Sequence, residues 1–303
     1  ARLGGHPAGQ DGGRWGVVIP ASFEYHAPTS LQDALTLLQT LGPDAKVLAG
    51  GHSLLPMMKL RLATPAHVID LRRVPGLREI TATDGEVVVG ALATHWAVQS
   101  SPLLQQRTPL LVEAAASIGD LQVRNMGTIG GSLAHADPAA DYPAAVLALE
   151  AVLVAQGPRG RRTIPATEFF TGLYTTALAP DELLVEVRVP VRPGGSAYLK
   201  FPHPASGFAV VGVASLLRLR DGKCEEARVG VTGVSPVPYR ARKVEEALVG
   251  RRLDPDTLRA AAEHAAEGVD VNEDVFADAA YRRHLATVFT RRSLAKALER
   301  AAG

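Results

Sequence analysis

The sequence predicts a fold of mixed helices and strands that is divided into at least two domains. Three observations lead to this prediction. Strand-like runs alternate with segments of helical spacing along the chain. The composition shifts at the proline- and glycine-rich residues 190–195, which indicates a linker. With 303 residues, 47% of them hydrophobic, the chain can bury more than one sizeable core.

The N-terminal quarter predicts a helix and two strands behind a flexible extension. Residues 1–17 are rich in glycine and polar residues and lack the apolar core of a secretory signal, so we expect an extension there. Residues 30–41 carry apolar side chains at helical spacing after Ser30, a favourable helix cap. Buried strands are expected at residues 46–49 and 67–71, and the first of them leads into a glycine-rich segment.

The rest of the chain predicts two antiparallel hairpins and several helices. Aspartate–glycine turns join the expected hairpin strands, which are residues 77–81 with 86–90 and residues 209–219 with 227–231. Apolar residues at helical spacing predict helices at residues 109–118, 144–149, 240–249, 254–266 and 280–302. Because the last three helices also carry many charges, we expect solvated faces there.

Two glycine-rich loops are the strongest functional signal. The first is Ala49-Gly50-Gly51-His52-Ser53, and the second runs from Thr128 to Ser132 around a second glycine pair. Paired glycines let backbone N–H groups turn toward an anion and let a diphosphate approach the main chain. Neither loop contains the lysine of a Walker-type loop, and the G-x-G-x-x-G fingerprint is missing. We therefore expect a nucleotide cradle of another type.

Composition excludes several classes of function. The formal net charge is +1, from 32 basic and 31 acidic residues, so no global field attracts nucleic acid or an anionic membrane. No apolar run approaches the roughly 20 residues needed to cross a bilayer. The single cysteine, Cys224, excludes an internal disulfide and fits a reducing compartment. One cysteine also cannot hold an iron–sulfur cluster, which needs four such ligands.

No catalytic residue and no metal site are expected from the motifs. His52 and His135 lie near the loops without cysteine or carboxylate partners at ligand spacing. Asp141 lies just before an apolar helix, and two interpretations stay open for it: a helix cap, or a carboxylate that accepts from ribose hydroxyls or adenine. A phosphotransferase would need a magnesium-binding carboxylate pair such as Asp137 with Asp141, but Pro138 between them argues against a shared helical face.

The motifs together resemble those of the FAD-binding medium subunits of molybdenum hydroxylases, in the xanthine dehydrogenase family. Within that family the carbon monoxide dehydrogenase type is most similar. The resemblance rests on residues 49–61, on Thr128 to Gly131 and on the segment from Asp137 to Asp141. It implies an α+β fold of the vanillyl-alcohol-oxidase (PCMH) type, with an FAD-binding domain at residues 18–192, in subdomains of about 18–75 and 76–192. A smaller C-terminal α+β domain follows at residues 196–303.

The resemblance also implies the residues that bind FAD. Both glycine loops contact the diphosphate region, Asp141 lies on the adenosine side, and Lys200 lies close to the isoalloxazine, with Phe208 at the flavin face. A surface charge is the alternative for Lys200, and a core aromatic is the alternative for Phe208. The implied cofactor-binding residues are Ala49, Gly50, Gly51, His52, Ser53, Leu54, Thr128, Ile129, Gly130, Gly131, Ser132, Asp141, Leu178, Lys200 and Phe208.

As a function, the resemblance implies an electron-transfer subunit of an oxidoreductase. A large molybdenum-cofactor subunit oxidises the substrate, and a small subunit with [2Fe–2S] clusters passes electrons to FAD, in a dimer of heterotrimers. FAD then reduces quinone, NAD or oxygen. Carbon monoxide is the first choice of substrate; aldehydes, xanthine or other purines, and N-heterocycles are alternatives. The complex is expected in the cytoplasm, with any membrane association through its partners. A flavin-free scaffold subunit is the alternative of another class.

Overall fold

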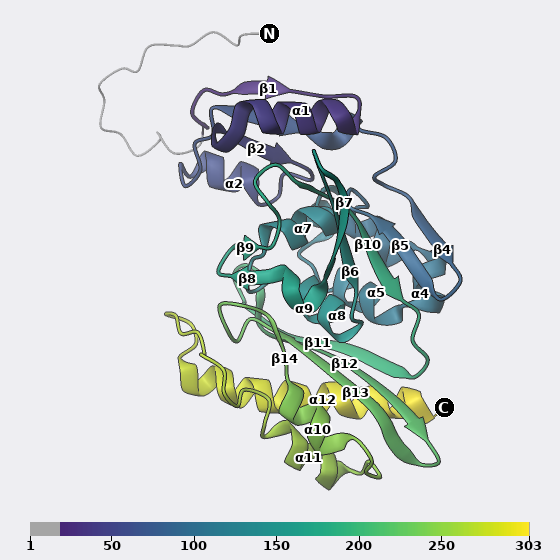
Figure 1. Ribbon diagram of the computed structural model, residues 1–303. Coiled ribbons are helices and arrows are strands. Elements are labelled where there is room, and N and C mark those ends of the chain that lie inside the picture. The colour runs from purple at the N-terminus through teal and green to yellow at the C-terminus, as the bar shows by residue number, and fades with distance from the viewer. Residues whose placement is uncertain (1–18, 303) are drawn as a thin grey trace.

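The structure, a computed structural model, describes residues 19–302 (Figure 1). The extension predicted at residues 1–17 lies outside the described residues. Three sheets of three or more strands follow one another along the molecule, each with helices beside it, and the α+β prediction is confirmed. None of the described helices combines the length and the apolar character that a membrane crossing requires.

The first unit is a small parallel sheet in the order β1-β3-β2. Its elements are β1 (Glu24–His26), α1 (Leu31–Leu41), β2 (Ala45–Leu48), α2 (Leu54–Lys59) and β3 (His67–Asp70). The Ser30 hydroxyl accepts from the Asp33 N–H at 3.0 Å and caps α1, as predicted. The helix buries Ala34, Leu35 and Leu38 in a core shared with Ile69. Strand β2 pairs in parallel with β3, and the first glycine loop follows the C-terminal end of β2.

The second unit is an antiparallel sheet in the order β4-β5-β10-β6-β7, accompanied by short helices. Its strands are β4 (Ile80–Thr83), β5 (Glu86–Gly90), β6 (Val152–Gly157), β7 (Gly160–Pro165) and β10 (Leu183–Pro190), with a hairpin of β8 (Phe170–Gly172) and β9 (Thr175–Thr176). Its helices are α3 (His95–Ser100), α4 (Pro102–Arg107), α5 (Pro109–Ala116), α6 (Leu121–Met126), α7 (Ile129–His135), α8 (Tyr142–Ala148) and α9 (Ala166–Phe169).

The third unit is an antiparallel sheet with helices packed against it. Its elements are β11 (Gly195–Pro202), β12 (Ala209–Arg220), β13 (Lys223–Thr232), β14 (Tyr239–Arg240), α10 (Arg242–Leu248), α11 (Pro255–Ala262) and α12 (Ala279–Ala302). The three predicted C-terminal helices are confirmed, with α11 shorter than expected. The predicted linker is also shorter, because Gly195 already belongs to β11, where a Cβ would overlap the Ala297 carbonyl of α12.

Helix α8 connects the second unit to the third. All of its residues are buried, and its backbone lies so close to β13 that a Cβ on Gly230 would overlap the Ala144 carbonyl. Just after the helix, the Glu150 carboxylate accepts from Arg192 at 2.9 Å and from Arg240 at 3.2 Å. This tight contact fixes Asp141, at the start of α8, against the sheet of the third unit.

Candidate nucleotide-binding site

The first glycine loop presents unpaired backbone N–H groups. It runs from the end of β2 to the start of α2, and Gly51 adopts a φ of +80°, which favours glycine. The first turn of α2 uses the carbonyls of Gly51 and Ser53 as acceptors. Among the described residues, no hydrogen-bond acceptor is found for the N–H groups of residues 51–54. These donors are suited to hold an anion, because unpaired N–H groups at a helix start attract negative charge.

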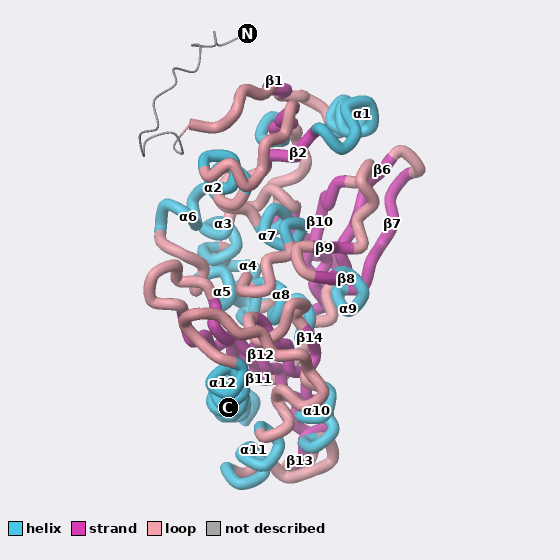
Figure 2. Tube along the Cα trace, turned by 90° about the vertical axis from the view of Figure 1, so that its left-hand side faces the viewer, coloured by secondary structure: helices cyan, strands magenta, loops and turns pink. Residues whose placement is uncertain are grey.

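The two predicted loops lie side by side. A Cβ on Gly50 would overlap the carbonyl oxygen of Met126 and lie 2.6 Å from Cα of Gly127, at the entrance to the second loop. A Cβ on Gly131 would lie 3.4 Å from Cβ of Ala49. In Figure 2, α2, which follows the first loop, and α6, which precedes the second, lie on the same side of the molecule. Segments far apart in the sequence thus lie in contact, as the binding of a single nucleotide by both loops would require.

The backbone N–H groups of the second loop bond within the chain and do not turn toward an anion, contrary to the expectation from the sequence. The N–H groups of Ile129 and Gly130 donate to the carbonyls of Ala93 and Ala91, at 3.0 and 2.8 Å. The N–H of Gly131 donates to the Thr128 hydroxyl at 3.1 Å, which caps α7. Since these donors are already used within the chain, the second loop offers a close-packed wall and the Ser132 hydroxyl instead of free N–H groups.

A buried histidine stabilises the contact between the loops. The His95 backbone N–H donates to the Gly127 carbonyl at 2.9 Å, and its ring Nδ1 lies 3.2 Å from the Tyr142 hydroxyl. The ring packs so closely that a Cβ on Gly127 would lie 2.5 Å from Nε2. Burial lowers the pKa of His95 to about 4, and electrostatic interaction with the neighbouring His52 and Arg124 acts in the same direction. His95 is therefore neutral at pH 7.

Acidification is expected to destabilise this contact through His95. The pKa of a histidine in the unfolded chain is about 6.5, above the folded value of about 4. The stability contributed by neutral His95 is thus complete above pH 6.5 and is lost as the pH falls through 4. Between pH 7.5 and 4.5 the loss amounts to about 2.5 kcal/mol. Urea unfolding at both pH values should show this extra loss in the wild type compared with His95→Asn. Equal losses in both proteins would contradict the assignment.

Asp141, at the start of α8, and Lys200, on β11, form a buried ion pair. Lys200 Nζ lies 2.9 Å from Asp141 Oδ1, and the two side chains are 8% and 5% exposed. The Tyr198 hydroxyl donates to Asp141 Oδ1 at 2.6 Å, and Lys200 Nζ also donates to the Ser117 carbonyl at 2.6 Å. Burial raises the pKa of Asp141 to about 6, while Lys200 and Tyr198 oppose that rise. The carboxylate is therefore ionised at pH 7.

This geometry corrects several sequence interpretations. Asp141 occupies the N-cap position of α8, but its side chain makes no capping hydrogen bond and is engaged by Tyr198 and Lys200 instead. Lys200 is buried, so the surface-charge alternative is wrong. Because the two side chains touch, they cannot serve opposite ends of an extended FAD, and one of the two implied placements needs revision. The pair also leaves Asp141 engaged by an ammonium group, which removes support for a magnesium site with Asp137.

Two further predicted residues take different positions. Phe208 is 46% exposed on the loop before β12, so the core-aromatic alternative is wrong and its ring is free to meet a ligand. Leu178 is partly buried against the core of the second unit. Neither position tests a contact with a cofactor, and both residues stay predictions as FAD ligands.

Sequence reasoning missed Tyr198 and His95 as parts of this site. Tyr198 and Lys200 are two residues apart on β11, so both point to the same face of the sheet. Gly212 on the neighbouring strand leaves the space that the Tyr198 hydroxyl fills, since a Cβ there would overlap it. Because side chains alternate between the two faces of a strand, the position of Tyr198 two residues before Lys200 could have indicated that both belong to the same face. His95 had none, because its partner Tyr142 lies far along the chain.

Two family models match the chain. Residues 21–192 match the model described as FAD binding domain in molybdopterin dehydrogenase. Residues 196–297 match the model described as CO dehydrogenase flavoprotein C-terminal domain.

Similar proteins agree with these matches. The carbon monoxide dehydrogenase medium chain of Hydrogenophaga pseudoflava is 44% identical over 94% of this chain and 100% of its own. The 6-hydroxypseudooxynicotine dehydrogenase complex subunit alpha of Paenarthrobacter nicotinovorans is 41% identical over 93% and 96%. A solved structure of carbon monoxide dehydrogenase from Hydrogenophaga pseudoflava has a chain that superposes with a TM-score of 0.91 at 46% identity. The match covers 93% of this chain and 99% of that one.

Proposed function

Because the chain belongs to the family of FAD-binding medium subunits of molybdenum hydroxylases, with FAD as its cofactor, we propose that it is the electron-transfer subunit of such a complex. The [2Fe–2S] clusters of a partner subunit would supply electrons, and an external acceptor would take them up. FAD contributes the ability to exchange electrons singly or in pairs. The observation that carries the proposal is the junction of the two loops, with its unpaired N–H groups.

The residues at this junction fit the diphosphate of FAD. The N–H groups of residues 51–54 would donate to phosphate oxygens, and the Ser132 hydroxyl would add a further donor from the second loop. The close contact of Gly50 with residues 126 and 127 holds the loops at a fixed separation. The protein's part in the reaction is therefore to bind and orient the cofactor, and no acid–base pair is needed for that.

Electrons have to reach the flavin from outside this chain. Its one cysteine, Cys224, is buried, and burial raises the pKa of the thiol to about 11, so the thiol is unreactive at neutral pH. A single cysteine cannot ligate a cluster. We therefore assign the clusters to a separate small subunit and the reduction of the acceptor to this subunit's flavin.

The carbon monoxide dehydrogenase relatives imply large and small partner subunits. The surface beside the loops is suited to such contacts, because apolar side chains are exposed there. Leu60 and Leu62 follow α2 and are 56% and 71% exposed, while Leu121 and Met126, at the two ends of α6, are 53% and 45% exposed. We propose a dimer of heterotrimers in the cytoplasm, with any membrane association made by the partners.

Carbon monoxide is our first proposal for the substrate of the complex. It is supported by the relative from Hydrogenophaga pseudoflava, which is a carbon monoxide dehydrogenase medium chain. Aldehydes, xanthine and N-heterocycles are the alternatives, and the relative from Paenarthrobacter nicotinovorans, named for a nicotine-derived substrate, favours the last class. Quinone, NAD or oxygen is the proposed acceptor.

Coexpression with the genes beside its own tests the proposed function. We expect the purified chain to carry about one FAD per polypeptide and to copurify with one larger and one smaller subunit. Addition of carbon monoxide without an acceptor should bleach the flavin absorption of the complex. A chain that takes up FAD but remains alone would contradict the complex, whereas a colourless chain that fails to take up FAD would favour the scaffold alternative.

A further inference from the structure

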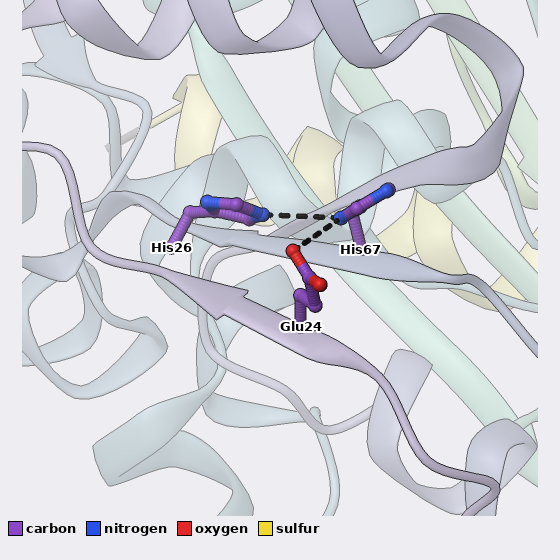
Figure 3. Close-up of side chains that lie close together, drawn as sticks. All are labelled: Glu24, His26 and His67. Atoms are coloured by element: carbon purple, nitrogen blue, oxygen red, sulfur yellow. Dashed lines mark hydrogen bonds and ion pairs between the residues drawn. The ribbon is translucent and has the colours of Figure 1, made fainter. Parts of the chain in front are cut away.

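We propose that Glu24, His26 and His67 form a binding site for a divalent transition-metal ion on the first unit, with zinc as the best match. Figure 3 shows the three side chains pointing toward one another from the neighbouring strands β1 and β3. The spacing in the sequence gave no signal of this site, because His67 is far along the chain from the other two. The inference is independent of the flavin function.

The strand register explains why the three side chains meet. Glu24 and His26 are two residues apart on β1, so they point to the same face of the sheet. In the parallel pairing of β1 with β3, His67 lies directly beside Glu24. Tyr25 points to the opposite face, where its hydroxyl donates to Asp70 at 2.5 Å. Two paired strands, rather than loops, thus present the three side chains.

The ligand atoms lie at the separations that one ion requires. His26 Nε2 is 3.2 Å from His67 Nδ1, close to the roughly 3.3 Å between two nitrogens bound tetrahedrally to zinc at about 2.0–2.1 Å. Glu24 Oε2 is 3.7 Å from His67 Nδ1. All three ligand atoms lie within 4.8 Å of one another. Since the Glu24 side chain is 74% exposed, it can close the remaining gap without disturbing a packed core.

The convergence of electron pairs argues for a cation. A carboxylate oxygen and two imidazole nitrogens face one another here. In a neutral imidazole ring, one nitrogen carries a proton and the other offers a lone pair. A proton on His67 Nδ1 can bond well to only one of its two neighbours. A divalent ion at the centre accepts a lone pair from all three atoms, with water as the fourth ligand.

The chemistry of the donors indicates which ion is bound. Two imidazoles with one carboxylate suit zinc and neighbouring transition metals, whereas magnesium and calcium prefer oxygen ligands alone. The His67 side chain is 23% exposed and that of Glu24 is largely exposed, so the ion can enter from solvent. Because β1 is an edge strand of three residues, an ion bound to both strands would tie it to β3 and stabilise the first unit.

Zinc titration of the full chain tests the proposal. The flavin-loaded protein is stripped with chelator, and binding of zinc chloride is followed by calorimetry and by the visible spectrum of cobalt as a substitute ion. We expect one zinc per chain and a rise of a few degrees in the melting temperature at a hundredfold excess over the dissociation constant. His26→Gln and His67→Gln should each weaken zinc binding at least about tenfold, since even loss of a supporting partner costs that much.

The matched control is His264→Gln. His264 Nδ1 lies 2.5 Å from Glu267 Oε2 at the surface, and this histidine–carboxylate pair belongs to no group of three ligand side chains among the described residues. This variant should retain the zinc equivalent. Flavin content confirms that each variant is folded. Absence of stoichiometric zinc binding in folded protein would overturn the proposal, as would binding that survives both His26→Gln and His67→Gln, and the two histidines would then be a hydrogen-bonded pair only.

Discussion

Gly50→Ala is expected to weaken FAD binding by about tenfold to hundredfold while the third unit stays folded. The new Cβ would overlap the Met126 carbonyl oxygen and lie 2.6 Å from Cα of Gly127. Both neighbours are backbone atoms, so the two loops have to move apart instead of a side chain rotating away. Overpacking of this kind costs about 1–3 kcal/mol. If this free energy is subtracted from the binding free energy of FAD, it corresponds to the stated loss of affinity. Fluorescence titration of flavin-free protein with FAD measures the effect.

Gly172→Ala is the matched control for this experiment. Gly172 lies in β8 of the second unit, and its Cβ would approach Thr175 Cβ only to an ordinary contact of 3.6 Å. FAD affinity should therefore change little in this variant. If Gly50→Ala binds FAD as tightly as Gly172→Ala does, the contact between the loops is not what holds the cofactor.

The sequence predicted those parts of the fold that have a local cause. The Ser30 cap and the apolar spacing of α1 were readable, as were the hairpin of β12 and β13 and the long helix α12. Helices α3, α4 and α6 were missed because six residues are too few to show a period. Each of them starts at a side-chain cap, from Thr94, Ser101 and Asp120 respectively. Capping alone was the usable signal there.

The candidate site was predictable only where backbone chemistry dictates residue type. The left-handed Gly51 and the closely packed Gly50 and Gly130 have to be glycine, so both loops were visible in the sequence. Which N–H groups remain free depends on tertiary contacts such as that of Ile129 with Ala93. No local pattern reveals those contacts, and therefore the different roles of the two loops emerged only from the structure.

Asp141→Asn is expected to destabilise the protein by about 3–5 kcal/mol at pH 7, because it leaves the Lys200 ammonium buried without its counter-charge. The amide keeps the size of the side chain and an acceptor for the Tyr198 hydroxyl, so the loss reports on charge and not on packing. Lys200→Met should cost less. The pKa of Asp141 is already about 6, and without the ammonium it would rise further, so the carboxyl group would take up a proton and become neutral. Urea unfolding of both variants measures the asymmetry.

The double variant Asp141→Asn with Lys200→Met separates a pairwise interaction from two independent ones. Because no buried charge is then left unpaired, it should be more stable than Asp141→Asn alone, although it carries one more substitution. Costs that simply add would show that the two side chains act separately. FAD affinity measured on the same proteins shows whether the ion pair contacts the cofactor. A stable double variant with lost FAD affinity would mean that it does. Unchanged affinity would mean that its role is to hold the start of α8 against β11, which shapes the site without touching the ligand.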